Sequence, residues 1–254
     1  MMASKWSVST LSAARLPALR WLLPAACALC GAACDDLVCD ACMADFFSDD
    51  APRCWQCANP MAGSGTAGIP GALRCGRCQA HAPAFDATLV AVDYAPPLTQ
   101  LVLQLKFGSR LALATLFAQR LQCAVQRQAN CALPTLLCPV PLGPGRLAER
   151  GFNQALEIAR PLAQMLGLPL YPTLAQRVRE TQAQTHVAPD ERARNIEHAF
   201  TVAPEALGLV RGSHIGIVDD VMSSGQTLGE LAATFKRFGA ARVTNLVFAR
   251  TPPR

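Results

Sequence analysis

The chain contains 254 residues, of which 51% are apolar and 16% are charged, and its formal net charge is +5. This length allows one large or two modest domains with a real hydrophobic core. The net charge is too mild to indicate nucleic-acid binding on its own, and no segment reaches the apolar length of a membrane span.

The first 26 residues are moderately apolar and carry three scattered basic residues, Lys5, Arg15 and Arg20. No uninterrupted apolar run follows a basic start, so the segment lacks the pattern of a signal peptide. We interpret residues 1–26 as an N-terminal lead. The sequence therefore predicts a cytoplasmic protein without a transmembrane segment.

Cysteines dominate the next segment, since nine of the twelve lie between residues 27 and 78. A C-x-x-C turn directs two thiolates at one cation, and two such turns make a closed tetrahedral site that suits Zn²⁺. Four C-x-x-C pairs predict a double zinc ribbon over residues 27–80 with two structural zinc ions, and Cys34 is left over as a bystander. The expected metal ligands are Cys27, Cys30, Cys39, Cys42, Cys54, Cys57, Cys75 and Cys78.

The pairing of these turns and the identity of the metal stay open at this point. Sequential pairing, with two pairs in each ribbon, is the simplest arrangement, but the spacing does not exclude a crossed one. An iron–sulfur cluster or a redox site is an alternative to zinc, because sites with four sulfurs also suit iron. Disulfides would need an oxidising compartment, and nothing in the sequence exports the chain.

Apolar patterns then predict alternating strands and helices. A strand is expected over residues 85–92, and the Pro96-Pro97 turn leads into a helix that contains Leu101, Leu105 and Lys106. Another helix is expected near residues 110–122, and a second buried strand over residues 136–141.

Two basic segments follow the second strand. The loop over residues 143–154 carries Arg146, Arg150 and Gly151, and its guanidinium groups and backbone amides suit a pyrophosphate group. A helix is expected from there to about residue 166. Residues 177–200, with Arg192 and Arg194, suit a flap that closes over a phosphorylated ligand. The alternative for both segments is a solvated basic surface loop.

The most informative segment follows the apolar run Ile215–Val218. Asp219 and Asp220 stand where that strand is expected to end, which is the edge at which open α/β sheets bind ligands. Residues 223–227 are small or polar, and residues 228–238 continue as an amphipathic helix. Hydroxyl groups and the free N–H groups of a helix start suit a phosphate. The two carboxylates suit ribose hydroxyls, or Mg²⁺ held through water.

Residues 219–227 resemble the phosphoribosyl pyrophosphate (PRPP) motif of type I phosphoribosyltransferases. Together with the C-x-x-C pairs, Leu105-Lys106-Phe107 and Arg150-Gly151-Phe152-Asn153-Gln154, they resemble the competence protein F family over residues 27–250. The resemblance implies a Cys-rich zinc-ribbon domain followed, over residues 85–254, by a type I phosphoribosyltransferase-like α/β domain, a parallel sheet flanked by helices. It also implies a role in natural transformation, in which incoming single-stranded DNA is handled with a helicase-like competence protein at the inner membrane, or in DNA use as a nutrient.

Displacement at C1 of the sugar, with pyrophosphate leaving, is the reaction that such a site would catalyse. Asp219, Asp220 and Arg150 are the candidate catalytic residues, and Mg²⁺ would stabilise the leaving group. The expected PRPP-binding residues are Asp219, Asp220, Ser223, Ser224, Gly225, Gln226, Thr227, Arg150, Gly151, Lys106, Arg192 and Arg194.

Three functions are compatible with this pattern. The first is a PRPP-binding competence protein that handles single-stranded DNA. The second is an active nucleobase phosphoribosyltransferase of nucleotide salvage. The third is a zinc-ribbon DNA-binding module whose transferase domain is not catalytic. The ribbon favours the first and third functions, whereas the intact acidic pair argues against a relic domain.

Overall fold

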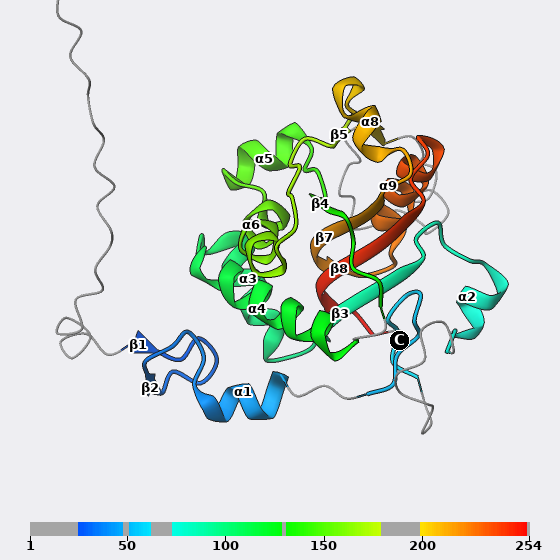
Figure 1. Cartoon of the computed structure of the whole chain (residues 1–254). Helices are drawn as coiled ribbons and strands as arrows, with labels where there is room; N and C mark the ends of the chain where they lie inside the picture. The colour runs from blue at the N-terminus through cyan, green and yellow to red at the C-terminus, as the bar shows by residue number, and fades with distance from the viewer. Residues whose placement is uncertain (1–24, 48–50, 62–72, 129–130, 179–198, 253–254) are drawn as a thin grey trace, which may run out of the picture.

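Four parallel strands form the central sheet of the protein. The computed structural model describes residues 25–47, 51–61, 73–128, 131–178 and 199–252. The strand order is β3 (Ala87–Asp93), β8 (Arg242–Arg250), β7 (His214–Met222) and β4 (Leu136–Pro139), and every neighbouring pair is parallel. The predicted α/β class with a parallel sheet is therefore confirmed (Figure 1).

Helices cover both faces of this sheet. One face carries α3 (Leu98–Phe107), α4 (Ala112–Arg127) and α6 (Gln154–Leu166) and is termed the α4 face. The other carries α9 (Gln226–Arg237) and a small antiparallel pair, β5 (Ala175–Arg177) and β6 (Phe200–Val202), and is termed the α9 face. Three short elements connect these strands and helices: α5 (Pro144–Arg150), the 3-10 turn Pro204–Ala206 and α8 (Leu207–Val210).

The alternation of side chains along the strands separates two hydrophobic cores. In β8, Val243 and Val247 join the core of the α9 face, whereas Leu246 and Phe248 join the core of the α4 face. Phe248 stacks on Phe117 of α4, with ring centroids 3.5 Å apart. Covering both faces in this way explains why the strands read as continuous apolar runs.

The structure moves two boundaries around the most informative segment. The sequence pattern predicted that β7 ends at Val218, but the strand continues to Met222. Its pairing with the equally long β8 runs on to Met222 and Arg250. The acidic pair therefore lies within the strand. At the other end of α9, Phe238 lies past the last helical residue and is exposed, although the sequence pattern placed it on the apolar stripe.

Two further boundaries differ from the expectation. The predicted loop over residues 143–154 contains α5, which begins at Pro144, a favoured first helical residue, and is followed by Gly151 with a left-handed φ of 75°. The helix expected near residues 110–122 runs from Ala112 to Arg127.

Two small Cys-rich ribbons flank the sheet. The first ribbon, residues 25–47, contains the antiparallel pair β1 (Ala25–Ala26) and β2 (Ala33–Cys34), followed by α1 (Asp40–Phe47). The second ribbon, residues 51–61 and 73–80, contains an isolated antiparallel bridge between Arg53 and Pro60 and ends in α2 (Gly76–Ala80).

The two ribbons pack on opposite faces of the sheet. Val38, Cys42 and Phe47 of the first ribbon join the core of the α4 face. Cys54 and Cys78 of the second ribbon join the core of the α9 face. Figure 1 shows the first ribbon with α1 at the lower left and α2 of the second ribbon at the right. Each ribbon thus contributes side chains to one of the two main cores.

None of the helices in the described ranges combines the length and the apolar character that a membrane crossing demands.

Candidate functional site

Each ribbon brings its four expected ligands together. The sulfurs of Cys27, Cys30, Cys39 and Cys42 lie within 4.8 Å of one another, and so do those of Cys54, Cys57, Cys75 and Cys78. The sequential pairing of the C-x-x-C turns is therefore confirmed. Cys34 stays outside its cluster, since its thiol donates to the carbonyl oxygen of Asp36 at 2.9 Å.

The spacing of the sulfurs suits a tetrahedral ion. The sulfurs of Cys30 and Cys39 are 3.7 Å apart, and those of Cys57 and Cys75 are 3.6 Å apart. Tetrahedral Zn–S bonds of about 2.3 Å place neighbouring sulfurs about 3.8 Å apart. The residues present therefore fit two structural zinc ions, whose binding would add folding energy to both ribbons.

Backbone amides favour the thiolate form of one cysteine in each ribbon. The N–H of Cys75 donates to the sulfur of Cys54 at 3.3 Å, and the N–H of Cys39 donates to that of Cys27 at 3.4 Å. The hydrogen bond from the Cys57 thiol, together with such amides, lowers the pKa of Cys54 to about 4. Burial alone would raise the pKa of Cys27, but the amides outweigh it and lower that pKa to about 6. Because the thiolate is the form that binds metal, one cysteine in each cluster favours the metal-binding form at neutral pH.

The loop after β7, residues 223–225, joins the strand to the start of α9 through a tight turn. The chain turns at Gly225, whose φ of 82° is left-handed, and α9 begins at Gln226. The left-handed φ favours glycine at residue 225, and a Cβ there would also lie 2.6 Å from the Met222 methyl group, which would have to shift. Ser223 and Ser224 are exposed beside it. The Ser224 hydroxyl accepts the N–H of Gln226, the first residue of α9, at 3.4 Å and donates to its Oε1 at 3.3 Å, so a hydroxyl and a helix start meet at the carboxyl end of a central strand.

The two acidic residues of β7 have unequal surroundings. Asp220 is 2% exposed, and its Oδ2 lies 2.7 Å from Nζ of Lys106 on α3. Asp219 is only partly buried, and its Oδ1 accepts the N–H of Asp220 at 2.9 Å. Burial and the negative charge of Asp220 raise the pKa of Asp219 to about 8, although Lys106 and that N–H act in the opposite direction. Asp219 thus has a carboxyl group with a raised pKa, whereas Asp220 is held by an ion pair.

The end of α3 connects the acidic pair to the Arg-rich segment. Lys106 meets Asp220, and the next residue, Phe107, has the Arg150 guanidinium over its ring, 5.4 Å from the centroid. The Phe107 side chain is 65% exposed. Three predicted site residues from distant parts of the sequence, Lys106, Arg150 and Asp220, are therefore brought together around one helix end.

Gly151 and Asn153 of the same segment have local structural roles. The Gly151 N–H donates to Leu147 at 2.8 Å and closes α5. Asn153 caps α6 by accepting the Ala155 N–H at 3.0 Å, and its Nδ2 donates to the carbonyl of Val140 at 3.0 Å. These contacts explain the glycine and the asparagine without a ligand. Two other predicted site residues, Arg192 and Arg194, lie outside the described residues.

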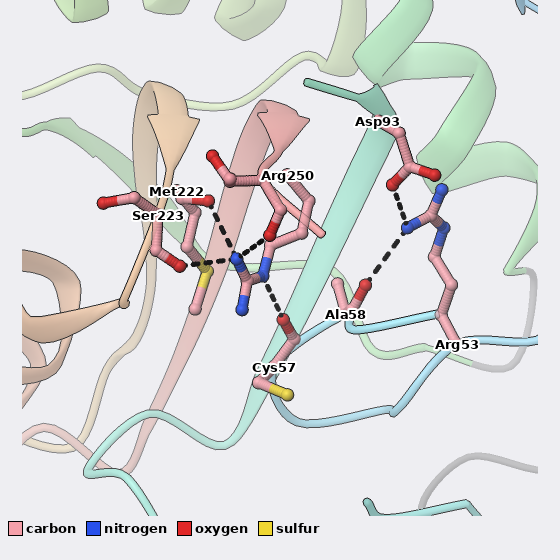
Figure 2. A network of polar contacts seen from close by, with 8 residues as sticks. Arg53, Cys57, Ala58, Asp93, Met222, Ser223 and Arg250 are labelled. Carbon is pink, nitrogen blue, oxygen red and sulfur yellow. Dashed lines mark hydrogen bonds and ion pairs between the residues drawn. The ribbon is translucent and has the colours of Figure 1, made fainter. Parts of the chain in front are cut away.

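A buried arginine that the sequence analysis did not single out lies beside the loop. Arg250, the last residue of β8, is 3% exposed and donates from Nε to the carbonyl of Cys57 at 3.0 Å. Its Nη1 donates to the carbonyls of Met222 (3.1 Å), Ser223 and Thr251 (Figure 2). A basic residue at the end of the apolar run 246–249 is the sequence feature that would have identified it.

The comparisons with known proteins agree with this architecture. A double zinc ribbon domain model matches residues 18–79, and a phosphoribosyl transferase domain model matches residues 153–253. The DNA utilization protein YhgH of Salmonella typhi is 39% identical over 202 residues, which cover 78% of this chain and 84% of the relative. The same protein of Escherichia coli K12 is 34% identical over 205 residues, which cover 80% of this chain and 86% of the relative.

Competence protein F of Haemophilus influenzae is 29% identical over 175 residues, covering 68% of this chain and 76% of the relative. The chain belongs to the competence protein F family. In this member, the phosphoribosyltransferase-like α/β fold and two four-cysteine ribbons are both present. The family match to residues 153–253 contains the acidic pair and the loop after β7, whereas Lys106 and Arg150 precede it.

Proposed function

We propose that this protein binds PRPP with Mg²⁺ at the loop after β7, and that this binding serves the handling of single-stranded DNA. One observation carries the proposal. A half-buried carboxyl group, a buried acid and an exposed hydroxyl loop converge at the carboxyl end of a central strand, within a matched phosphoribosyl transferase domain.

In this proposal each part of PRPP has its own partners. The N–H groups at the start of α9 and the hydroxyls of residues 223–227 hold the 5′-phosphate. Asp219 accepts a ribose hydroxyl. Asp220 is buried in the free protein, where its oxygens contact Lys106 and the N–H of Val221 at 2.9 Å. Its contact with the ribose therefore requires Lys106 to turn toward the ligand, where Lys106 and Arg150 face the pyrophosphate.

Mg²⁺ fits the same site, because carboxylate and phosphate oxygens are the ligands that it prefers. When bound, the ion would neutralise the charge of the pyrophosphate group. The residues that would hold it are Asp220 and Asp219, directly or through water, with Asp219 in its deprotonated form.

Calorimetric titration of PRPP into the full chain, with and without Mg²⁺, tests this site. We expect one PRPP per chain, and we expect Asp219→Asn and Asp220→Ala each to weaken binding by roughly 10- to 100-fold, the loss of one hydrogen bond to a charged group. The matched control is Asp86→Asn, which removes a different Lys-paired aspartate, 2.8 Å from Lys236. Equal affinity of the wild type, Asp219→Asn and Asp220→Ala chains would refute the site.

Turnover is a second candidate function, and the raised pKa of Asp219 favours it, because a carboxyl group that titrates near neutral pH suits proton transfer. In the reaction, the C1–pyrophosphate bond breaks, a C1–N bond to a nucleobase forms, and the proton of the base leaves. A screen of free nucleobases for pyrophosphate release tests it. Release with one base would establish a phosphoribosyltransferase; no release with any base would leave PRPP as a bound ligand only.

Of the two ribbons, the second is the better candidate for the surface that binds single-stranded DNA. It carries Arg53, Arg74 and Arg77 and no acidic residue in its described part, whereas the first ribbon carries four aspartates and no basic residue. Arg74 and Arg77 are exposed, and Trp55, whose backbone N–H donates to the carbonyl of Leu73 at 2.8 Å, is partly exposed. Basic groups with an aromatic side chain are typical of single-strand binding. The names of the relatives, DNA utilization protein and competence protein F, support this assignment.

Because each ribbon is part of a core, point substitutions test DNA binding better than deletion of residues 27–80. We expect the Arg74→Ala/Arg77→Ala chain to bind a labelled single-stranded oligonucleotide more weakly, with a salt slope reduced by about 1.4, two phosphate contacts for a single strand. The control is Arg160→Ala/Arg211→Ala, which removes two exposed arginines elsewhere. An equal loss in both double variants would contradict the assignment.

We propose a cytoplasmic location, where metal-binding thiolates stay reduced. A helicase-like competence protein at the inner membrane is the proposed partner in DNA handling.

A further inference from the structure

The second ribbon and the loop after β7 meet at the carboxyl edge of the sheet. In the strand register, Arg250 lies opposite Met222 of β7 on one side and opposite Asp93 of β3 on the other. Two residues of the second ribbon contact this row: the carbonyl of Cys57 accepts from Arg250, and Arg53 pairs with Asp93 at 2.9 Å (Figure 2). The edge that presents the loop is therefore bordered by a four-cysteine ribbon.

The geometry of the Arg250 guanidinium joins the two parts directly. Nε is directed at Cys57, a predicted metal ligand, and Nη1 at the carbonyls of Met222 and Ser223, where the loop starts. The side chain is buried, and so are its bonds to Cys57 and Met222, so these two carbonyls would lose a buried partner if the arginine were removed. Lysine has no planar fork and donates from one point, so it cannot serve both sides in the same way.

A second connection runs through Phe85. Gln56 of the second ribbon donates from Nε2 to the carbonyl of Phe85 at 3.0 Å. The Phe85 ring in turn lies against the loop, since a Cβ on Gly225 would be 3.8 Å from its Cζ. The Gln56 carbonyl also accepts the Thr88 hydroxyl of β3 at 2.7 Å. The C-x-x-C turn 54–57 is thus fixed both to the sheet and to the residues that support the loop.

We propose that Arg250 is a positioning residue for the loop after β7, and that it makes the shape of this loop depend on metal binding by the second ribbon, not by the first. This deepens the proposed function, since the loop is the proposed PRPP phosphate site. The four-cysteine cluster with its metal is a compact, negatively charged group, which fixes the Cys57 backbone and attracts the Arg250 cation. Loss of that metal releases the turn 54–57, and with it the carbonyl that orients Arg250.

The first ribbon provides the internal comparison. Its turns form hydrogen bonds to other residues of the ribbon, as in Cys27 N–H to Ala32 and Ala28 N–H to Leu37, both at 2.8 Å. It packs on the α4 face through apolar side chains. Its metal should therefore stabilise the protein without fixing the conformation of the loop after β7.

Hydrogen–deuterium exchange on ligand-free, metal-loaded full chains tests the proposal, with the amides of residues 222–229 as the readout. We expect Arg250→Lys to raise the exchange rate of this loop by roughly tenfold or more while both metals are retained, because the local structure opens more often. The matched control is Arg237→Lys, since the wild-type Arg237 guanidinium bonds Glu230 and Thr234 on α9. In this control, residues 222–229 should exchange at the wild-type rate.

A second pair of variants separates the two metals. Cys75→Ser removes a ligand of the second ribbon, and Cys30→Ser removes one of the first, with the metal content of each chain measured directly. We expect only Cys75→Ser to speed exchange of the loop and to weaken PRPP binding, by roughly tenfold. Wild-type exchange in Arg250→Lys, or the same acceleration in both cysteine variants, would overturn the proposal.

The readouts also separate this proposal from the proposed function. If the wild type gives no heat with PRPP, the proposed function fails, whereas the exchange rates still decide whether Arg250 and the second metal position the loop.

Discussion

The two four-cysteine ribbons share one local design but join the rest of the protein in different ways. Each has a backbone N–H that donates to the sulfur of its first cysteine, and each closes four sulfurs around one point. The first ribbon packs against the α4 face with apolar side chains such as Val38 and Phe47. The second ribbon also donates and accepts hydrogen bonds through Gln56 and Cys57. One partner is Thr88 of the sheet, and two, Phe85 and Arg250, lie against the candidate phosphate loop. We propose that one motif supports stability on one face and site geometry on the other.

Metal removal has the largest expected effect on this comparison. Cys30 is exposed, whereas three of the four cysteines in the second ribbon are buried. We therefore expect a chelator to take the first ribbon's metal before the second's, with PRPP affinity lost only in the second step. Complete removal should lower the unfolding midpoint by roughly 10 °C or more, since structural zinc contributes folding energy directly. Metal content, calorimetric unfolding and PRPP titration along one chelator series measure the order of metal loss, the unfolding midpoint and the PRPP affinity. Loss of PRPP affinity in the first step would contradict the proposed difference between the ribbons.

Phe47→Ala tests the apolar attachment of the first ribbon. Phe47 is 5% exposed at the end of α1, and its truncation should cost about 3–5 kcal/mol of unfolding free energy. Exchange of the loop at residues 222–229 should stay at the wild-type rate. The neighbouring Phe46, which is 38% exposed, supplies the control, since Phe46→Ala should have a much smaller effect on denaturant unfolding. Faster loop exchange in Phe47→Ala would mean that both ribbons act on the loop.

Thr88→Val tests the polar attachment of the second ribbon. The Thr88 hydroxyl donates to the Gln56 carbonyl at 2.7 Å and accepts from Nδ2 of Asn245 at 3.1 Å, all in buried surroundings. Valine keeps the shape but leaves both partners unpaired, so we expect a loss of about 1–3 kcal/mol in urea unfolding. Exchange over residues 54–57 should rise as well. Unchanged stability would show that these hydrogen bonds do not hold the ribbon.

Asp219→Asn, measured against pH, has the smallest expected effect. The pKa of Asp219 is raised to about 8, so between pH 4 and pH 8 the folded chain binds a proton that the unfolded chain has lost. Wild-type stability should therefore fall as pH rises through this window, and the variant, whose asparagine side chain does not titrate, should not share that fall. We expect the variant to gain about 1 kcal/mol on the wild type between pH 5.5 and pH 8, a value reduced by solvent access. A constant difference in urea unfolding would contradict the raised pKa.

The parts that the sequence predicted well are those fixed by neighbours along the chain. The spacing of Cys54, Cys57, Cys75 and Cys78 indicated a ligand set, because C-x-x-C turns are local, and the apolar run 215–218 marked the central strand. The helix at 144–150 was missed because Gly143-Pro144-Gly145 is typical of a loop, although proline also begins helices.

The parts that were not predicted depend on contacts between distant segments. Nothing in the sequence shows that Lys106 neutralises Asp220, or that Arg250 meets Cys57, because these contacts arise only when α3, β7, β8 and the second ribbon pack together. The same packing explains why β7 continues through the acidic pair: its length is set by β8, its neighbour in the sheet.

A crystal structure of the metal-loaded chain with PRPP and Mg²⁺ tests the central claim most directly. We expect the 5′-phosphate to accept hydrogen bonds from the amides and hydroxyls of residues 223–227, with Asp219 at the ribose and Arg250 still bonded to Cys57. A phosphate bound elsewhere, or a loop that stays closed to the ligand under saturating PRPP, would contradict the account.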